Sequence, residues 1–305
     1  MNEKLKNIVL DVVRHSPLDP ESQEKLLYWG KFRDSLNLEN PLTYNEKVNW
    51  RKLRCRNPLY VTCADKLAAR EYVKEKIGGE YLIPLLYSGE SITPEVLAAL
   101  GDDIVVKANH DSGSAVIIRK NSIEEARKAC KRMDEALAYD FGKETNQWWY
   151  AEIPRRVMVE SLILNEEGVL AYDFKFFVFR QPDGKRPKMY IQLDCDRGTP
   201  NYHRAFYNED HVQVESSGQG VVLDGVPNKK RDFPELENYD EFVRIVHKLA
   251  DDFDHVRVDM YYARGRIYFG ELTFSDGGGR SEWHPNDLDR ELGDCWHLDT
   301  SYQTG

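Results

Sequence analysis

The chain has 305 residues, of which 41% are hydrophobic, and its 52 acidic and 42 basic side chains give a formal net charge of −10. This composition is typical of a globular protein and excludes a disordered, collagen-like or membrane-embedded chain. Because a single core stops growing near ~250–300 residues, the length predicts two or three packed domains. A chain with this excess of acidic residues lacks the basic surface that binds a nucleic-acid backbone, so we expect no nucleic-acid partner.

The first twenty residues carry apolar side chains at helical spacing, interrupted by charges. A signal peptide needs an unbroken apolar stretch, and a membrane span needs about 18 apolar residues in a row, so we expect neither. The five cysteines are scattered and form no CxxC pair, which argues against a zinc site and a disulfide framework. These features favour a cytoplasmic protein.

Helical patterns dominate the first ninety residues. The predicted helices are Leu5–Arg14, Pro20–Phe32, Tyr44–Leu53 and Ala64–Ile77, followed by a short strand, Tyr81–Tyr87. The pattern then changes to strands and a helix in quick succession. This stretch contains a short helix Pro94–Leu100, strands Asp103–Ala108 and Ala115–Arg119, and a helix Ile123–Ala138.

The second half of the chain is richer in strands. Its predicted elements are the strands Val157–Ile163, Ala171–Arg180 and Lys188–Asp194, a loop-rich segment 195–232, a helix Tyr239–Phe253, and a hairpin of Val256–Tyr262 with Arg266–Phe274. We therefore predict an α+β fold with a helical N-terminal region (1–92), a small lid (93–156) and a C-terminal subdomain (157–305).

The hairpin carries two acids at an informative spacing. A three-residue turn at Ala263–Gly265 places Asp259 opposite Phe269, so that Glu271 is its diagonal neighbour on the same face, about 7–8 Å away. Two carboxylates at that separation can hold one hard cation between them. The alternative is an exposed sheet face with solvated acids, but Ile267 and Phe269 on that face indicate partial burial. The pattern favours a metal site.

A strand lysine and a polar loop form the second candidate. Lys107 follows two valines and precedes the loop Asn109–Ser114, whose small residues expose backbone N–H groups that can cover phosphate oxygens. A lysine inside a strand must face solvent or meet an anion, because a buried unpaired ammonium is costly. The GxxxxGK[ST] phosphate loop is absent, and this segment alone equally fits a surface lysine beside a turn.

Two further charged residues lie in strands. Glu160 interrupts an apolar strand, where it either faces water or accepts from the amine or hydroxyl of a nucleotide. Lys175 shares a strand face with Asp173, so the alternative to ligand binding is an ordinary ion pair.

The order of these segments is specific. VVKANHDSGSAVII, VMVESLI and VRVDMYYARGRIYFGELTFSDGGG resemble, in sequence order, the phosphate loop, the adenine hinge and the metal block of the ATP-grasp superfamily. Together with TYNEKVNW and DKLAAREYVKEKIGGEYLIPLLY in the helical leader, they are similar to the TupA-like ATP-grasp family of bacterial polysaccharide clusters. The resemblance covers roughly Tyr44 to Gly293.

The resemblance implies a role for each matching residue. Nucleotide contacts are implied for Lys66, Lys107, Ser112, Gly113, Ser114, Glu160, Ser161, Leu162 and Lys175. Magnesium would be held by Asp259 and Glu271, and by Thr273 where the family usually has an asparagine. Arg257 and Lys107 would act on the transferred phosphate, and the acceptor would bind at Gly277, Gly278, Gly279 and Arg280.

The implied reaction is ATP-dependent joining of a carboxylate and an amine through an acylphosphate. The implied partners are ATP with Mg²⁺, a uronic acid or other glycan carboxylate, and an amino acid or amine. A glycan kinase on the same fold is an alternative. A glycosyltransferase is another, but its DxD-type candidate, Asp194–Asp196, equally fits a turn.

Overall fold

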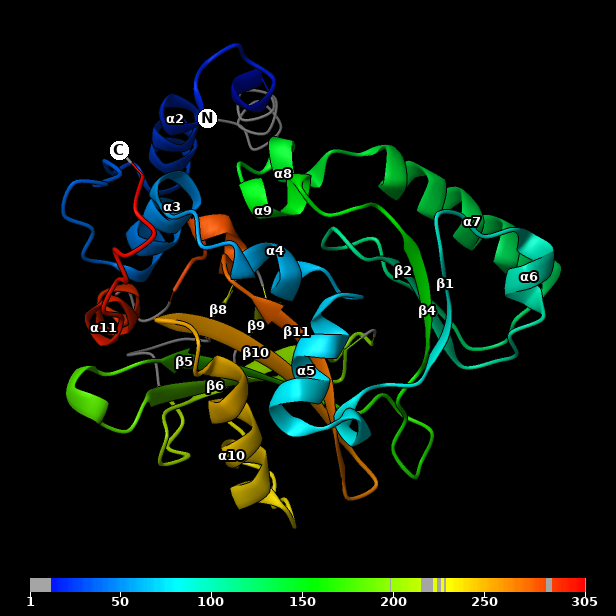
Figure 1. The fold of residues 1–305 in the computed structure, drawn as a ribbon. Coiled ribbons are helices and arrows are strands. Elements are labelled where there is room, and N and C mark those ends of the chain that lie inside the picture. The colour runs from blue at the N-terminus through cyan, green and yellow to red at the C-terminus, as the bar shows by residue number, and fades with distance from the viewer. Residues whose placement is uncertain are drawn as a thin grey trace.

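A computed structural model describes residues 12–197, 199–214, 222–223, 226–227, 229–283 and 287–304. Most of the predicted helix Leu5–Arg14 lies outside these residues. Helices and antiparallel sheets occur along the described chain, which confirms the predicted α+β class. Of the helices that the structure describes, none is long and apolar enough to cross a membrane. Figure 1 shows a smaller and a larger sheet with helices packed around each.

The smaller sheet has the strand order β1-β4-β2-β3. Its strands are β1 (Leu85–Gly89), β2 (Ile104–Ala108), β3 (Val116–Ile118) and β4 (Val157–Ser161), and its helices are α6 (Pro94–Ala98) and α7 (Ile123–Ala138). Ile104, Val106 and Val159 form an apolar face that packs with residues of both helices. Since alternate strand residues point to opposite faces, Lys107 and Glu160 lie on the other face. The sheet takes β1 from before residue 93 and β4 from after residue 156, so it extends beyond both predicted borders of the lid.

The larger sheet has the strand order β11-β10-β5-β6-β7. Its strands are β5 (Tyr172–Phe179), β6 (Lys188–Cys195), β7 (His203–Tyr207), β10 (His255–Ala263) and β11 (Arg266–Thr273). One face packs Phe174, Phe176 and Val258 against Phe242 and Ile245 of helix α10, which spans Tyr239–Ala250. The predicted loop-rich segment 195–232 contains β7 and a small hairpin of β8 (Val222–Leu223) and β9 (Val226–Pro227), and a 3-10 turn η2 (Pro182–Gly184) joins β5 to β6.

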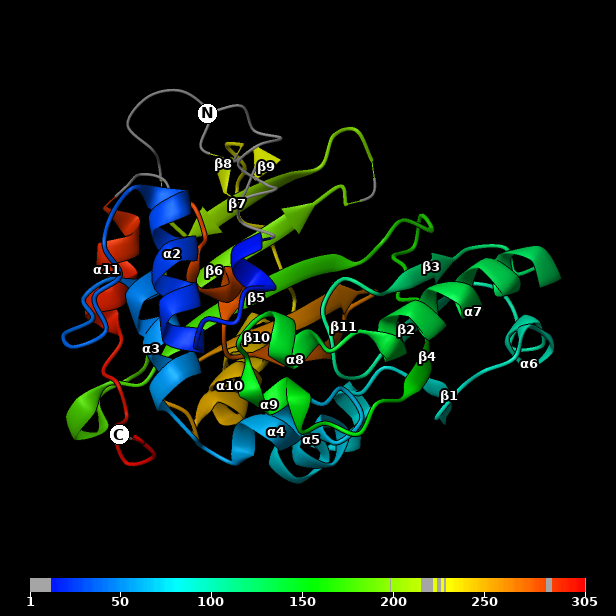
Figure 2. The ribbon, with the colours of Figure 1, turned by 90° about the horizontal axis from the view of Figure 1, so that it is seen from above.

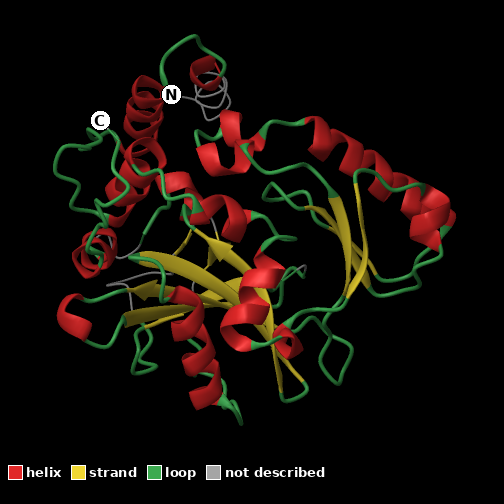
Figure 3. Ribbon diagram, in the orientation of Figure 1, coloured by secondary structure: helices red, strands yellow, loops and turns green. Residues whose placement is uncertain are grey.

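Helices α3 (Tyr44–Arg54) and α11 (Leu288–Cys295) cover the other face of the larger sheet, where Tyr44 and Leu292 pack with Phe177 and Phe179. α4 (Leu59–Ala64) and α5 (Ala69–Ile77) pack on the same face as α10, and α5 lies beside α10 (Figures 2 and 3). The remaining helices are α2 (Pro20–Phe32), α8 (Phe141–Glu144) and α9 (Trp148–Ala151), with the 3-10 segments η1 (Gly79–Tyr81) and η3 (Asp276–Gly279). The predicted helix Ala64–Ile77 is divided at Asp65, whose carboxylate accepts from the Leu67 N–H and from the Asn109 side chain. The strand expected from Tyr81 begins only at Leu85 because η1 precedes it.

Candidate active site

The β10–β11 hairpin differs from the predicted register. Its turn has two residues, Arg264 and Gly265, both with positive φ (54° and 67°), and Ala263 pairs with Arg266. A bulge beside Met260 adds one residue to β11, Gly270, so Asp259 pairs directly with Glu271. The three-residue turn and the diagonal arrangement were therefore wrong. The bulge compensates for the even turn and leaves both acids on one face.

Arg257 lies at the centre of these acids. Its guanidinium donates to both carboxylate oxygens of Asp259, at 2.7 Å each, and to the hydroxyl of Thr273 at 3.1 Å. It also forms an ion pair with Asp276 and lies 3.6 Å from Glu271. One arginine thus joins all three predicted metal-binding positions to the start of the glycine segment.

Burial and charge set the protonation of this cluster. Burial acts to lower the pKa of Arg257, but Asp259 and Asp276 raise it well above its usual range. Burial raises the pKa of Asp259 to about 6, against the opposing effects of Arg257 and Lys175. Burial also acts to raise the pKa of Glu271, but Lys66 and Arg257 outweigh it, so the net shift is downward. The lowered pKa favours the ionised form of Glu271, and its side chain is 35% exposed, so Glu271 is the acid better placed to bind a ligand.

Lys175 lies on the same sheet face. Its ammonium is 2.6 Å from Asp173, 3.6 Å from Asp194 and 3.7 Å from Asp259, and its side chain is 9% exposed. The ion pair with Asp173 is the alternative that the sequence left open, and it forms. Asp194 also accepts from Arg204 at 3.1 Å, so the first acid of the DxD-type candidate is engaged in ion pairs.

On the smaller sheet, Glu160 is bound by two cations. Its carboxylate lies 2.7 Å from Lys107 and 2.9 Å from Arg70, which comes from α5. Arg70 also donates to the carbonyl of Ile83. In this structure Glu160 therefore fixes the position of Lys107, and a nucleotide amine would have to compete with both cations.

Hydrogen bonds of its own side chains stabilise the loop Asn109–Ser114. The Ser114 hydroxyl donates to Asp111 at 2.6 Å and accepts from the Ala108 N–H, so this side chain is used inside the loop. Ser112 and Gly113 are exposed, and Gly113 has a φ of 89°.

Lys66 joins this loop to the larger sheet. Its ammonium donates to the carbonyl of Asp111 and lies 3.8 Å from Glu271, and its backbone N–H donates to Asn109. The backbone N–H groups of the two residues after Glu160 already have acceptors in the protein. The N–H of Ser161 donates to the Pro84 carbonyl, and the N–H of Leu162 donates to the Asp103 carbonyl. Of the predicted loop residues Ser112, Gly113 and Ser114, Ser112 lines the cavity that Glu271 also lines.

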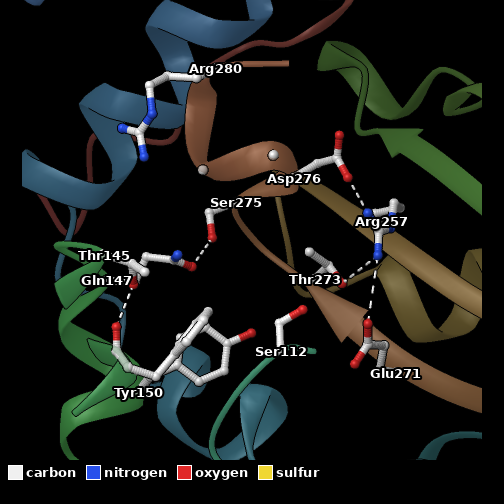
Figure 4. A pocket seen from close by; sticks show the side chains of 13 residues that line it. Ser112, Thr145, Gln147, Tyr150, Arg257, Glu271, Thr273, Ser275, Asp276 and Arg280 are labelled. Carbon is white, nitrogen blue, oxygen red and sulfur yellow. Dashed lines mark hydrogen bonds and ion pairs between the residues drawn. The ribbon is translucent and has the colours of Figure 1, made fainter. Parts of the chain in front are cut away.

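A cavity of about 300 Å³ lies between the loop and the glycine segment. It is lined by Ser112, Phe141, Thr145, Gln147, Tyr150, Arg257, Glu271, Thr273, Ser275, Asp276, Gly277, Gly278 and Arg280. Figure 4 shows Ser112 near Tyr150 and Glu271, with Arg257 between Asp276 and Thr273. The cavity therefore brings together predicted phosphate, metal and acceptor residues. One wall of the cavity is formed by residues of α8, α9 and the segment that connects them, namely Phe141, Thr145, Gln147 and Tyr150. The sequence did not predict this part of the site.

Helix α3 positions the glycine segment through buried polar side chains. Asn49 donates to the carbonyl of Gly279 at 2.8 Å, and Lys52 donates to that of Gly278 at 3.0 Å. Asn45 exchanges two hydrogen bonds with the backbone of Ser281. Gly277, Gly278 and Gly279 all have positive φ, which explains the run of three glycines.

A family model described as TupA-like ATP-grasp matches residues 46–297. The chain belongs to the TupA-like ATP-grasp family. The resemblance seen in the sequence is confirmed, as is the expected ATP-grasp fold, and the chain is an enzyme of the ATP-binding, ligase type. A search of curated proteins finds no match.

Solved structures similar to this TupA-like chain share little sequence with it. D-alanine–D-alanine ligase from Helicobacter pylori has 12% identity and a TM-score of 0.45, over 83% of this chain and 69% of that one. The same enzyme from Bacillus anthracis has 15% identity and a TM-score of 0.41, over 77% and 67%. The macrocyclase MdnC from Microcystis aeruginosa MRC, bound with its precursor peptide MdnA, has 11% identity and a TM-score of 0.37, over 92% and 72%.

Several residues of the site carry no sequence signal that identifies them. Arg70 lies in a helix with ordinary charge patterning, and Gln147 lies in an irregular segment. Asp276 had a usable signal, because it directly precedes the glycine run and follows the metal block by a few residues.

Proposed function

We propose that the chain is a carboxylate–amine ligase that works through an acylphosphate. The observation that carries this proposal is the pairing of Asp259 with Glu271 across the hairpin, with Arg257 and Lys66 in contact and Lys107 on the facing sheet. Acids for a metal thus lie beside cations for phosphate, at the edge of a cavity of about 300 Å³.

The donor set fits Mg²⁺. Among the described residues, no three His, Cys, Asp or Glu side chains converge as a complete metal site. Mg²⁺ is usually bound through one or two carboxylates, with substrate phosphates and water completing the shell. Asp259 and Glu271 would hold it, with Thr273 as a weaker hydroxyl ligand. When bound, it offsets negative charge on the phosphates of ATP.

The chain's own residues would position two successive reactions. An oxygen of the carboxylate substrate attacks the γ-phosphorus of ATP and ADP leaves, which gives an acylphosphate. The amine nitrogen then attacks the acyl carbon, phosphate leaves, and the nitrogen loses a proton to complete the amide. Arg257 and Lys107 would offset charge on the moving phosphoryl group, while Ser112 and Gly113 exclude water above it.

For substrates we propose a uronic acid or other glycan carboxylate and an amino acid or amine, in a cytoplasmic step of surface-polysaccharide synthesis. The support is the family resemblance of the sequence, together with the polar and aromatic lining of the cavity by Thr145, Gln147 and Tyr150. A cytoplasmic location is consistent with the need for ATP.

Trapping with hydroxylamine tests the proposal. Hydroxylamine replaces the amine and converts an acylphosphate into a hydroxamate, which gives a coloured iron complex. With MgATP and glucuronate, we expect ADP release and hydroxamate in equal amounts. A stable phosphorylated sugar without hydroxamate would identify a kinase, and an absence of ADP release across a panel of uronic acids and amino acids would contradict the proposal.

A further inference from the structure

Three charged side chains, two buried and one partly exposed, meet at the wall of the cavity. Glu24 of α2 accepts from Lys52 of α3 at 2.8 Å and pairs with Arg280, which lines the cavity. Glu24 and Lys52 are almost fully buried, and the side chain of Arg280 is 16% exposed. Asn146 donates to the same carboxylate at 3.0 Å.

These three residues carry one negative and two positive charges. Among the described residues, no second carboxylate contacts Lys52 or Arg280. Burying an uncompensated charge is costly, so such a site favours a further anion. Burial and the nearby Arg280 together lower the pKa of Lys52 to about 8, although Glu24 opposes the shift. The positive charge of Arg280 therefore disfavours the protonated form of Lys52.

The two cations differ in how far their donors are used. The Lys52 ammonium has three acceptors, Glu24, Asn49 and the Gly278 carbonyl, so its hydrogen-bonding capacity is filled. Arg280 has five N–H donors, and Glu24 is its sole hydrogen-bond partner among the described residues. Arg280 is therefore the member of the group that still has donors to offer, and it borders the cavity.

Arg280 also lies apart from the acids of the metal site. Figure 4 shows it beyond Ser275 and Gln147, on the far side of the cavity from Glu271. A carboxylate that is being phosphorylated must lie close to the γ-phosphate, near Glu271 and Arg257. A carboxylate at Arg280 is consequently a different one.

We propose that Arg280, backed by Glu24 and Lys52, binds a carboxylate that does not react, so that one of the two substrates carries a second acidic group. This inference rests on the proposed ligase function. A guanidinium fork matches a carboxylate with two parallel hydrogen bonds, and the bound anion balances the surplus charge of the wall. The group belongs either to the amine partner, as in an amino acid, or to a dicarboxylic acceptor.

The first experiment compares substrates with and without the second carboxylate. ADP release is measured with MgATP, glucuronate, and either glycine or one enantiomer of alanine as the amine, each compared with its α-amide. With the wild type, the acids should exceed the amides in kcat/KM by roughly tenfold or more. Arg280→Gln should reduce that ratio to about one, and Arg280→Lys should retain part of it.

A second arm distinguishes the source of the carboxylate. Hydroxylamine replaces the amine, and glucarate, a dicarboxylate, is compared with glucuronate. A preference for glucarate that is lost in Arg280→Gln assigns the group to the acceptor, whereas a lost preference for amino acids over amides assigns it to the amine partner. Unchanged ratios in both arms would overturn the inference. Arg290→Gln, an exposed arginine paired with Asp294 on α11, is the matched control and should keep both ratios.

A binding measurement keeps the inference testable if no substrate pair turns over. Glutarate should raise the melting temperature of the wild type more than glutaric diamide does, because it adds an anion to the folded state. Arg280→Gln should lose that difference, and an equal shift in both proteins would count against the site. Wild-type protein that shows this binding but never releases ADP would contradict the proposed function and leave the carboxylate site standing.

Discussion

Arg257 donates one hydrogen bond to each carboxylate oxygen of Asp259, two residues further along the same strand. The arginine therefore occupies both oxygens that a metal ion would use. Because the same guanidinium also contacts Asp276 and Thr273, it can shift its bonding toward them when a cation approaches Asp259. The site thus holds its acids together by an internal cation before any ligand is bound.

Replacing that arginine by lysine tests its geometry separately from its charge. A lysine keeps the positive charge but cannot span Asp259, Asp276 and Thr273 at once. We expect Arg257→Lys to lower kcat for ADP release by about 100-fold or more. Arg264→Lys, in the exposed hairpin turn, is the control and should behave as the wild type. Near-normal turnover in Arg257→Lys would show that only the charge matters.

Glu271 should be essential for turnover and dispensable for folding. Its ion pairs to Arg257 and Lys66 are long, 3.6 and 3.8 Å, and its side chain is partly exposed, so Glu271→Gln should change the free energy of unfolding by less than about 1 kcal/mol. ADP release should fall by about 100-fold or more in Glu271→Gln and Glu271→Ala. Full activity in Glu271→Ala would remove this residue from the metal site. Glu75→Gln, on the exposed side of α5, serves as control.

The third glycine of the run should not tolerate a side chain. Gly279 has a φ of 74°, and a Cβ there would lie 2.5 Å from the Asn49 amide nitrogen. Gly184 has a similar φ of 67° but open space around it, so Gly184→Ala should cost only about 1–2 kcal/mol of backbone strain. Gly279→Ala should cost about 1–3 kcal/mol more, through overpacking against α3. Urea unfolding of both variants measures the difference. Equal losses of unfolding free energy would mean that α3 accommodates the added methyl group at no cost.

His255 should make the folded state sensitive to mild acid. Burial, with Arg51 nearby, lowers its pKa well below the ordinary 6.5, and the neutral ring bonds Tyr44 and the Val178 carbonyl. Below pH 6.5 the unfolded chain takes up a proton that the folded one refuses, so stability is lost as pH falls. Between pH 7 and pH 5 this one group should remove about 2 kcal/mol of unfolding free energy.

Comparison with His255→Gln isolates that contribution. The substitution itself lowers stability at every pH, but the additional loss between pH 7 and pH 5 should shrink by about 2 kcal/mol. Urea titrations at the two pH values give both numbers. If wild type and variant lose the same amount, the acid sensitivity belongs to other groups.

The fold class and the hairpin acids could be predicted from sequence because period and composition report them directly. Asp259 and Glu271 were expected on one face, and they are, but for a different reason. A two-residue turn alone would have separated them, and the bulge at Gly270 brings them back. An isolated glycine in a strand is compatible with a bulge, yet one sequence cannot say whether the bulge forms.

The role of α3 could not be predicted in this way. Its polar residues Asn45, Asn49 and Lys52 look like a solvated helix face, whereas they are buried against backbone carbonyls and N–H groups near the end of the chain. Such long-range polar pairing leaves no local period. The same holds for Arg70 and Glu160, whose ion pair joins a helix to a strand ninety residues away.

The hydrogen bonds between α3 and the glycine segment also determine when the site can form during synthesis. The hydrogen bonds concerned join residues 226 to 236 positions apart. During synthesis α3 leaves the ribosome long before its partner is made, by roughly 10 to 50 s at ~5–20 residues per second. Throughout that interval the amides and the ammonium of α3 lack these partners, so the glycine segment can take its catalytic geometry only after residues 278–281 have been synthesised.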